Sequence, residues 1–91
     1  MKGYRLKIST PDGSVFDGEA VKLDVRGIEG ELAVMAGHVP FMTAVKPGTC
    51  RLLFDDGSER VGELDGGLLS VGSSEVTLLA AKFRWAEAYT T

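Results

Sequence analysis

Cysteine and histidine are nearly missing from this sequence, which has one of each among its 91 residues. With Cys50 alone, no disulfide can form within the chain, as is usual for a protein that is not exported. A structural zinc site needs about four cysteine or histidine ligands, so Cys50 and His38 are too few to form one. We therefore expect neither a disulfide framework nor a metal centre.

The sequence also lacks a cluster of basic side chains and a long apolar run. Its 10 lysines and arginines are scattered singly and its net charge is −3, whereas a nucleic-acid-binding face needs clustered cations. The longest uncharged stretch, residues 32–45, contains Gly37, His38 and Pro40 and is too short and too polar to cross a bilayer. Residues 1–3 lead into a patterned segment without an apolar signal region. We expect a cytoplasmic chain that neither binds nucleic acid nor inserts into a membrane.

What the sequence does contain is an ordinary globular composition with a two-residue period. Hydrophobic types make up 44% and charged types 25%, and a chain of this length has material for one domain. Apolar and polar side chains alternate in residues 4–8 and 21–25, as in half-buried strands. Turn signals at residues 11–13, 46–48 and 55–58 belong to a series that recurs about every 8 to 12 residues. This pattern predicts an all-β sandwich or barrel.

Two regions depart from the alternation. Gly62 and the pair Gly66–Gly67 disturb the parity, which predicts a bulge or a sheet corner where backbones approach closely. In residues 80–89 the alanines favour a helix, while Phe83 and Trp85 alternate as in a strand. We favour the strand.

Catalytic and carrier chemistry have little support in the sequence. A thiol nucleophile would need His38 to activate Cys50, but 12 positions of loop and turn separate them and no orienting group is marked. Lys46 lies in a turn, where a lysine can carry a swinging cofactor, although the adjacent Pro47 and the lack of flanking methionines argue against this. We expect no catalytic residue, no cofactor and no bound metal, and we keep a cofactor-carrier domain as the alternative.

The segment Gly27–Gly48 is the best candidate for a working surface. It is rich in glycine, holds the only histidine and mixes acidic, aromatic and methionine side chains, as contact loops do. Glu29 and Glu31 are its acidic members. Apolar members such as Phe41 and Met42 could equally belong to the core, so patterning alone leaves an interface and a core interpretation equally open.

Several motifs in the sequence closely resemble the epsilon subunit of F-type ATP synthases. The resemblance covers nearly all of residues 4–88, in order and at the family's spacing. The matching motifs are EGEL at 29–32, GHVP at 37–40 and TAVKPG at 43–48, together with TPDG at 10–13, GGLLSV at 66–71 and VTLLA at 76–80.

This resemblance implies a two-layer antiparallel β-sandwich of about ten short strands over residues 1–88, followed by a tail of residues 89–91. It implies a non-catalytic rotor subunit of the central stalk, docked on the gamma subunit and the c-ring and peripheral to the cytoplasmic face of the bacterial inner membrane. Carried over by position, the c-ring contacts are Glu29, Gly30 and Glu31. The gamma or c-ring contacts are His38, Val39, Pro40, Phe41, Met42 and Thr43.

The sequence departs from the family pattern at several positions. Ala33 and Ala36 replace the usual glycine and proline, which predicts a less rigid loop before Gly37. Phe83 and Trp85 replace small or charged residues. The family's C-terminal helical pair is absent, since the sequence ends four residues after the point where that pair should begin. We expect a subunit that couples but does not restrain ATP hydrolysis through those helices, unless the sequence is a piece of a longer chain.

Overall fold

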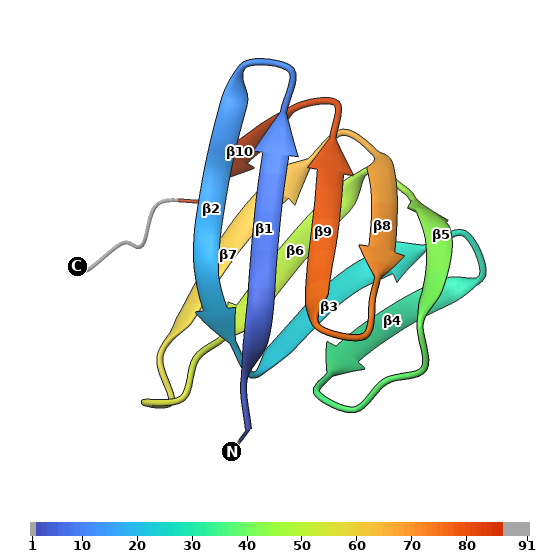
Figure 1. The fold of residues 1–91 in the computed structure, drawn as a ribbon. Coiled ribbons are helices and arrows are strands. Elements are labelled where there is room, and N and C mark those ends of the chain that lie inside the picture. The colour runs from blue at the N-terminus through green and yellow to red at the C-terminus, as the bar shows by residue number, and fades with distance from the viewer. Residues whose placement is uncertain (1, 87–91) are drawn as a thin grey trace.

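The structure is a computed structural model that describes residues 2–86, and these residues form ten β-strands (Figure 1). The strands are β1 (Tyr4–Thr10), β2 (Gly13–Ala20), β3 (Lys22–Gly27), β4 (Gly30–Met35), β5 (Phe41–Val45), β6 (Gly48–Leu53), β7 (Glu59–Leu64), β8 (Gly67–Val71), β9 (Glu75–Ala80) and β10 (Phe83–Trp85). The prediction of an all-β chain with about ten short strands is confirmed. No helix that could cross a membrane occurs in residues 2–86. The predicted domain end at residue 88 and the tail 89–91 lie outside the described residues.

The strands form two layers, as Figure 1 shows. The front layer contains β5, β8, β9, β1 and β2 in that order, and the back layer contains β10, β7, β6 and β3, with β4 on the far side of β3. Between β5 and β3 the only paired residues are Val45 and Gly27, and the Lys46 N–H donates to the Arg26 carbonyl at 2.8 Å. Within residues 2–86, strand pairing therefore joins the two layers at one narrow junction.

Most strand pairs are antiparallel, as predicted, but β1 and β9 run parallel. Leu6 lies beside Val76 and Ile8 beside Leu78 in this pair. The parallel pair arises because the chain crosses from the back layer to the front layer between β7 and β8, and β9 then turns back beside β8 and pairs with β1. It brings the first and ninth strands together in the centre of one sheet, which the alternation of single strands could not reveal.

The core lies between the two layers and consists of the inward-facing side chains that the two-residue period marks. The largest fully buried side chains come from both layers and are Leu6, Ile8, Leu23, Leu52, Leu69, Leu78, Val34 and Cys50. No polar or charged residue is buried among residues 2–86. An apolar filling of this kind holds the layers together by the removal of nonpolar surface from water.

An aromatic cluster fills the seam between β2 and β10, the two ends of the strand order. The Trp85 ring meets Phe16 edge-on at 6.3 Å and Phe83 at 4.9 Å, while Phe16 lies 5.8 Å from Phe54. The Arg60 guanidinium lies 3.7 Å above the Trp85 ring. The strand prediction for Phe83 and Trp85 is therefore confirmed, and these two residues close the sandwich along one side.

Glycine is needed for different structural reasons at the two positions singled out in the sequence. A side chain at Gly67 would collide with the Leu79 backbone carbonyl, so β8 and β9 do approach closely there, as predicted. Gly62 is a regular member of the ladder between β6 and β7, opposite Cys50, and the predicted bulge is absent. The missing side chain at Gly62 makes room for the Phe83 ring. A register shift does occur in the pair of β1 and β2, between Ile8 and Ser9.

Candidate docking surface

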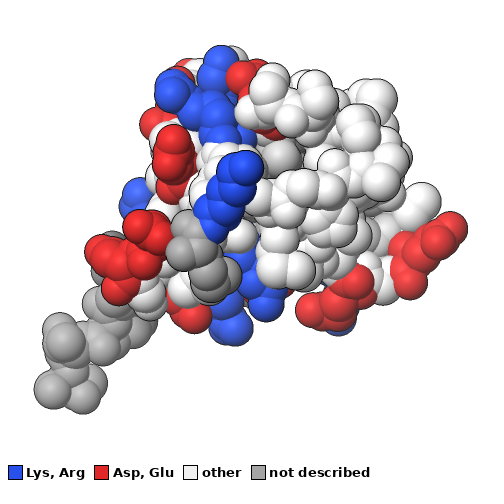
Figure 2. Space-filling model, turned by 60° about the horizontal axis from the view of Figure 1, so that its bottom comes forward, with Lys and Arg blue, Asp and Glu red and all other residues white. Residues whose placement is uncertain are grey.

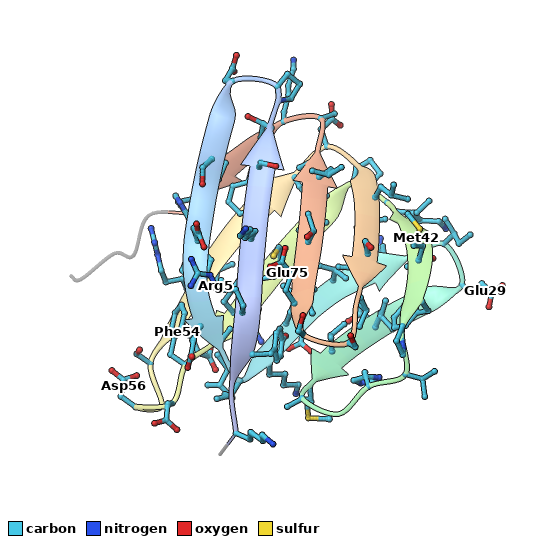
Figure 3. All side chains as sticks on the ribbon, in the orientation of Figure 1. Arg5, Glu29, Met42, Phe54, Asp56 and Glu75 are labelled. Carbon is cyan, nitrogen blue, oxygen red and sulfur yellow. The ribbon has the colours of Figure 1, made fainter. Side chains whose placement is uncertain are left out.

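The acidic residues Glu29 and Glu31 lie at the tip of the hairpin formed by β3 and β4. Gly30 has a φ of 127°, a conformation that favours glycine, and it allows the chain to reverse in a tight turn. Ile28 is 54% exposed beside the two carboxylates. In Figure 3 Glu29 points away from both layers at the far end of the hairpin. The tip therefore presents one aliphatic and two acidic side chains to solvent.

The residues His38, Val39 and Pro40 form an exposed loop between β4 and β5. Val39 is 77% exposed, and the His38 ring lies 6.3 Å from the ring of Phe41. This loop faces the turn between β8 and β9 across a shallow groove, to which Ser73 and Ser74 contribute. It lies at the end of the sandwich that is turned forward in Figure 2, where a broad area without charged side chains is visible.

A second groove, of about 550 Å³, lies between the hairpin tip and the start of β5. Residues 27–32 line one side and residues 41–43 the other. The contact residues expected from the resemblance thus separate after Pro40. Phe41, Met42 and Thr43 share a groove with Glu29–Glu31, while His38 and Pro40 line another. The core interpretation holds for Phe41, which packs against the core. The surface interpretation holds for Met42, which is 64% exposed.

Apolar side chains gather on part of the outer face of β5, β8 and β9. Ala44 pairs with Leu68, and Leu68 pairs with Leu79, so these side chains form a row across three strands. Leu68 is 38% and Leu79 49% exposed. Met42 lies on the same outer face, in the next row, opposite Ser70. We call Met42, Ala44, Leu68 and Leu79 the apolar face.

Sequence reasoning missed Leu68 and Leu79, although a signal was present. In a strand that is buried on one face only, apolar residues alternate with polar ones. The pairs Leu68–Leu69 and Leu78–Leu79 break this rule, as do Phe41–Met42 and Ala44–Val45. Two consecutive apolar residues in a strand place one side chain on each face, so each pair adds one apolar group to the outside of the front layer.

The outer face of the back layer carries charged side chains on β3, β6, β7 and β10, whereas the ion pairs of the front layer, Arg5 with Asp17 at 2.6 Å and Lys7 with Glu75 at 3.8 Å, lie on β1, β2 and β9. The ion pairs of the back layer join Lys22 to Asp24 at 3.8 Å, Arg51 to Glu59 at 3.7 Å and Arg84 to Glu63 at 2.6 Å. All of these side chains are at least one third exposed. Such pairs are solvated and contribute little to stability, and we call the outer face of the back layer the charged face.

The structure gives no support to a thiol nucleophile. Cys50 is fully buried in the core, and burial, with a smaller contribution from Asp24, raises the pKa of its thiol to about 12. The thiolate that such chemistry needs is therefore scarce at neutral pH. His38 lies on an exposed loop, in contact with Phe41. Among residues 2–86, no group of three or more His, Cys, Asp or Glu side chains is placed to hold a metal ion.

Comparison with known proteins gives matches to β-sandwich domains, the architecture described above. The family model for the ATP synthase Delta/Epsilon chain, beta-sandwich domain, matches residues 3–86. A chain in the cryo-EM structure of the Euglena gracilis mitochondrial ATP synthase, described as OSCP/F1/c-ring in rotational state 1, is similar with a TM-score of 0.86 and 20% identity over 91% of this chain and 53% of that one.

A chain from the central stalk and c-ring of the Tetrahymena thermophila mitochondrial ATP synthase is also similar. Its TM-score is 0.74 at 16% identity, over 90% of this chain and 66% of that one. The present chain thus spans about half the length of the Euglena chain and about two thirds of the Tetrahymena chain. At these identities the two matches establish a shared fold.

Proposed function

The chain belongs to the delta/epsilon chain family of ATP synthase, as a β-sandwich domain, and on that premise we propose that it is a non-catalytic subunit of the rotor. In this proposal the domain docks on the gamma subunit and on the c-ring and couples ion flow through the ring to ATP synthesis. The observation that carries the proposal is the contrast between the apolar face and the charged face. Exposed apolar side chains that adjoin on one side of a soluble domain are typical of an interface.

We assign the apolar face to the gamma subunit. Met42, Leu68 and Leu79 offer exposed aliphatic area on three neighbouring strands. In β5 and β8 the two rows that contain them are Met42 with Ser70 and Ala44 with Leu68, and neither row has a charged residue. Subunits of a rotor must stay joined through many turns, and permanent interfaces are more apolar than transient ones. The charged face would lose the hydration of its ion pairs in such a contact, so it is the poorer surface.

We assign the hairpin tip to the c-ring. Glu29 and Glu31 are exposed carboxylates that suit a polar loop with lysine, arginine or amide donors, and Ile28 beside them adds apolar contact. Charges of this kind fix orientation and register more than they add affinity. His38–Pro40 and the groove wall Phe41–Thr43 adjoin the two surfaces, and we place them at the gamma or c-ring contacts.

The architecture supports the transmission of torque. The two layers enclose a densely packed apolar core, and packed interiors deform little under load. The aromatic cluster closes one side, and the junction between Val45 and Gly27 joins the layers on the other. A domain built in this way can move as one body between two partners.

The proposal also fixes the surroundings of the domain. It places the chain in the F1 sector, peripheral to the membrane through its partners, with the sandwich extending over residues 1–88. The cytoplasmic face of a bacterial inner membrane is part of this proposal, while both structures of similar fold are mitochondrial.

Direct binding tests the proposal. The folded full chain is titrated with purified gamma subunit and, separately, with detergent-solubilised c-ring, and binding is followed by calorimetry. We expect binding to both partners. A chain with an intact β-sheet circular dichroism spectrum that binds neither would contradict the proposal.

The assignment of the hairpin tip is tested by Glu31→Lys, which we expect to weaken c-ring binding about tenfold while gamma binding stays unchanged. Because Glu31 lies opposite Arg26 in the ladder, Glu31→Gln serves as a second variant that places no cation beside that arginine. Glu19→Lys, with the same charge change on exposed β2, is the matched control and should bind normally. Loss of the fold in both Glu31 variants would mark Glu31 as a structural residue.

A further inference from the structure

One side-chain hydrogen bond joins the front layer to the hairpin of the back layer. The Tyr4 hydroxyl, on β1, donates to the backbone carbonyl of Val34, on β4, at 2.8 Å. The two residues are 30 positions apart.

Strand β4 has few other constraints. Within the described part of the chain β3 is the only strand that pairs with β4, and β4 lies off the main strand order. Yet β4 connects the acidic tip at its start to the His38–Pro40 loop after its end. A change in the angle of β4 would therefore move both segments relative to the apolar face.

The environment of Tyr4 makes the hydrogen bond durable. Its ring packs against the core, and a donor in such a place costs free energy if it loses its partner. Burial, followed by smaller contributions from Asp24 and Cys50, raises the pKa of Tyr4 well above its ordinary value. The hydroxyl thus keeps its proton, and with it the hydrogen bond, over the whole physiological pH range.

We propose that Tyr4 is a positioning residue for docking, because its hydroxyl holds β4 and the acidic tip at a fixed orientation to the apolar face. The partners that we assign to the tip and to the apolar face rest on the proposed function above. The hydrogen bond between Tyr4 and Val34 does not depend on that proposal. Two surfaces that must engage two partners at once gain affinity only if their geometry allows simultaneous contact. A fixed tip also avoids the loss of conformational freedom on binding.

Amide hydrogen exchange of the free full chain tests the link without any partner. In Tyr4→Phe we expect the protected amides of β4 to exchange about fivefold faster, since one hydrogen bond contributes about 1 kcal/mol, while those of β9 keep their rates. Ser58→Ala removes a hydroxyl that donates to Asp56 in the turn after β6, and it is the matched control. Equal acceleration in β4 and β9, or none in either, would overturn the inference.

Binding then tests the consequence. Tyr4→Phe should weaken c-ring binding about fivefold and leave gamma binding within error, because the apolar face is unchanged. If the wild type binds both partners and Tyr4→Phe binds both equally well, Tyr4 has no positioning role. If the wild type binds neither partner, the proposed function fails, and selective exchange in β4 would still establish the link.

Discussion

The outer faces of the two layers are built on the same strand geometry, but the apolar face on β5, β8 and β9 has no counterpart among the ion pairs of the charged face; the ion pairs of the front layer lie on β1, β2 and the start of β9. In the front layer, Leu68 and Leu79 project outward beside Met42, whereas the outward positions of β3, β6 and β7 include Asp24, Arg51 and Glu63. The inward positions of both layers are equally apolar. The core therefore requires apolar side chains at every second position only. The side chains at the remaining positions can differ with the surroundings of each outer face.

The two sides of the sandwich differ as well. Phe16, Phe83 and Trp85 close the side between β2 and β10 by ring contacts. On the opposite side, near β4 and β5, the only strand pairing between the layers within residues 2–86 is that of Gly27 on β3 with Val45 on β5. This side contains the groove of about 550 Å³. The closed side adds to the core, while the open side gathers the residues that we assign to docking.

The strongest test of the contrast between the faces is a charge placed on the apolar one. We expect Leu79→Lys to weaken gamma binding about 100-fold, because a charge left unpaired in an interface costs about 3 kcal/mol. Leu79 is 49% exposed in the free chain, so the fold should tolerate the change. Calorimetric titration with gamma gives the affinity, and thermal melting verifies the fold.

The matched control is Thr49→Lys, at an exposed position on the charged face. Thr49 lies opposite Glu63 in the ladder, so the new lysine has a carboxylate beside it. We expect Thr49→Lys to change the affinity for gamma less than threefold, because surface substitutions away from an interface have small effects. A larger loss for Thr49→Lys than for Leu79→Lys would assign gamma to the charged face.

Effects of similar or smaller size, on stability and not on binding, are expected from alanine at the two glycines beneath the faces. Gly67→Ala would press a methyl group against the Leu79 carbonyl and within 3.0 Å of the Ala80 Cα, and backbone yields little. Gly62→Ala would meet the Phe83 ring, a side chain that can rotate. We expect losses in unfolding free energy of about 3 kcal/mol and about 1 kcal/mol respectively. Urea denaturation measures both, and the reverse order would show that β8 and β9 can separate.

The last prediction concerns Cys50 beneath the charged face and the dependence of the unfolding free energy on pH. Its thiol pKa is raised from 9.0 to about 12, so between these values the unfolded chain loses the proton while the folded chain retains it. Stability therefore falls as pH rises through this window, by up to about 1.4 kcal/mol per pH unit. Cys50→Ala should have a shallower slope in urea denaturation from pH 8 to pH 11. Tyr4 titrates in both proteins, and its pKa is raised mainly by its own burial, so the difference between the slopes reports chiefly on the thiol. Equal slopes would contradict the burial of the thiol.

Much of the fold could be predicted because the alternation is a local property. The strand of residues 21–25 and the turn at residues 55–58 follow from neighbouring side chains alone, and both are confirmed. Gly62 was misjudged because its reason, the Phe83 ring, lies 21 positions away in sequence. The parallel pairing of β1 with β9 was missed for the same reason.

The candidate site divides in the same way. Glu29 and Glu31 could be placed in an exposed turn from the flanking glycines, and the structure has Glu29 in that turn and Glu31 beside it at the start of β4, both exposed. Leu68 and Leu79 could not be joined to Met42, because the strand order that makes them neighbours depends on pairings between distant segments. The specific contacts of Glu29–Glu31 and His38–Thr43 stay predictions that the binding experiments test.

The sequence by itself determined that the chain is all-β, where its strands and turns fall and which family signature it contains, since these depend on residue type and short-range spacing. Only the tertiary structure decided which outward residues adjoin. A two-residue period sorts side chains into two faces without saying which strands lie side by side, and the order of strands is set by long-range pairing around the core. That order gathers Met42, Leu68 and Leu79 into one surface and brings Tyr4 to Val34.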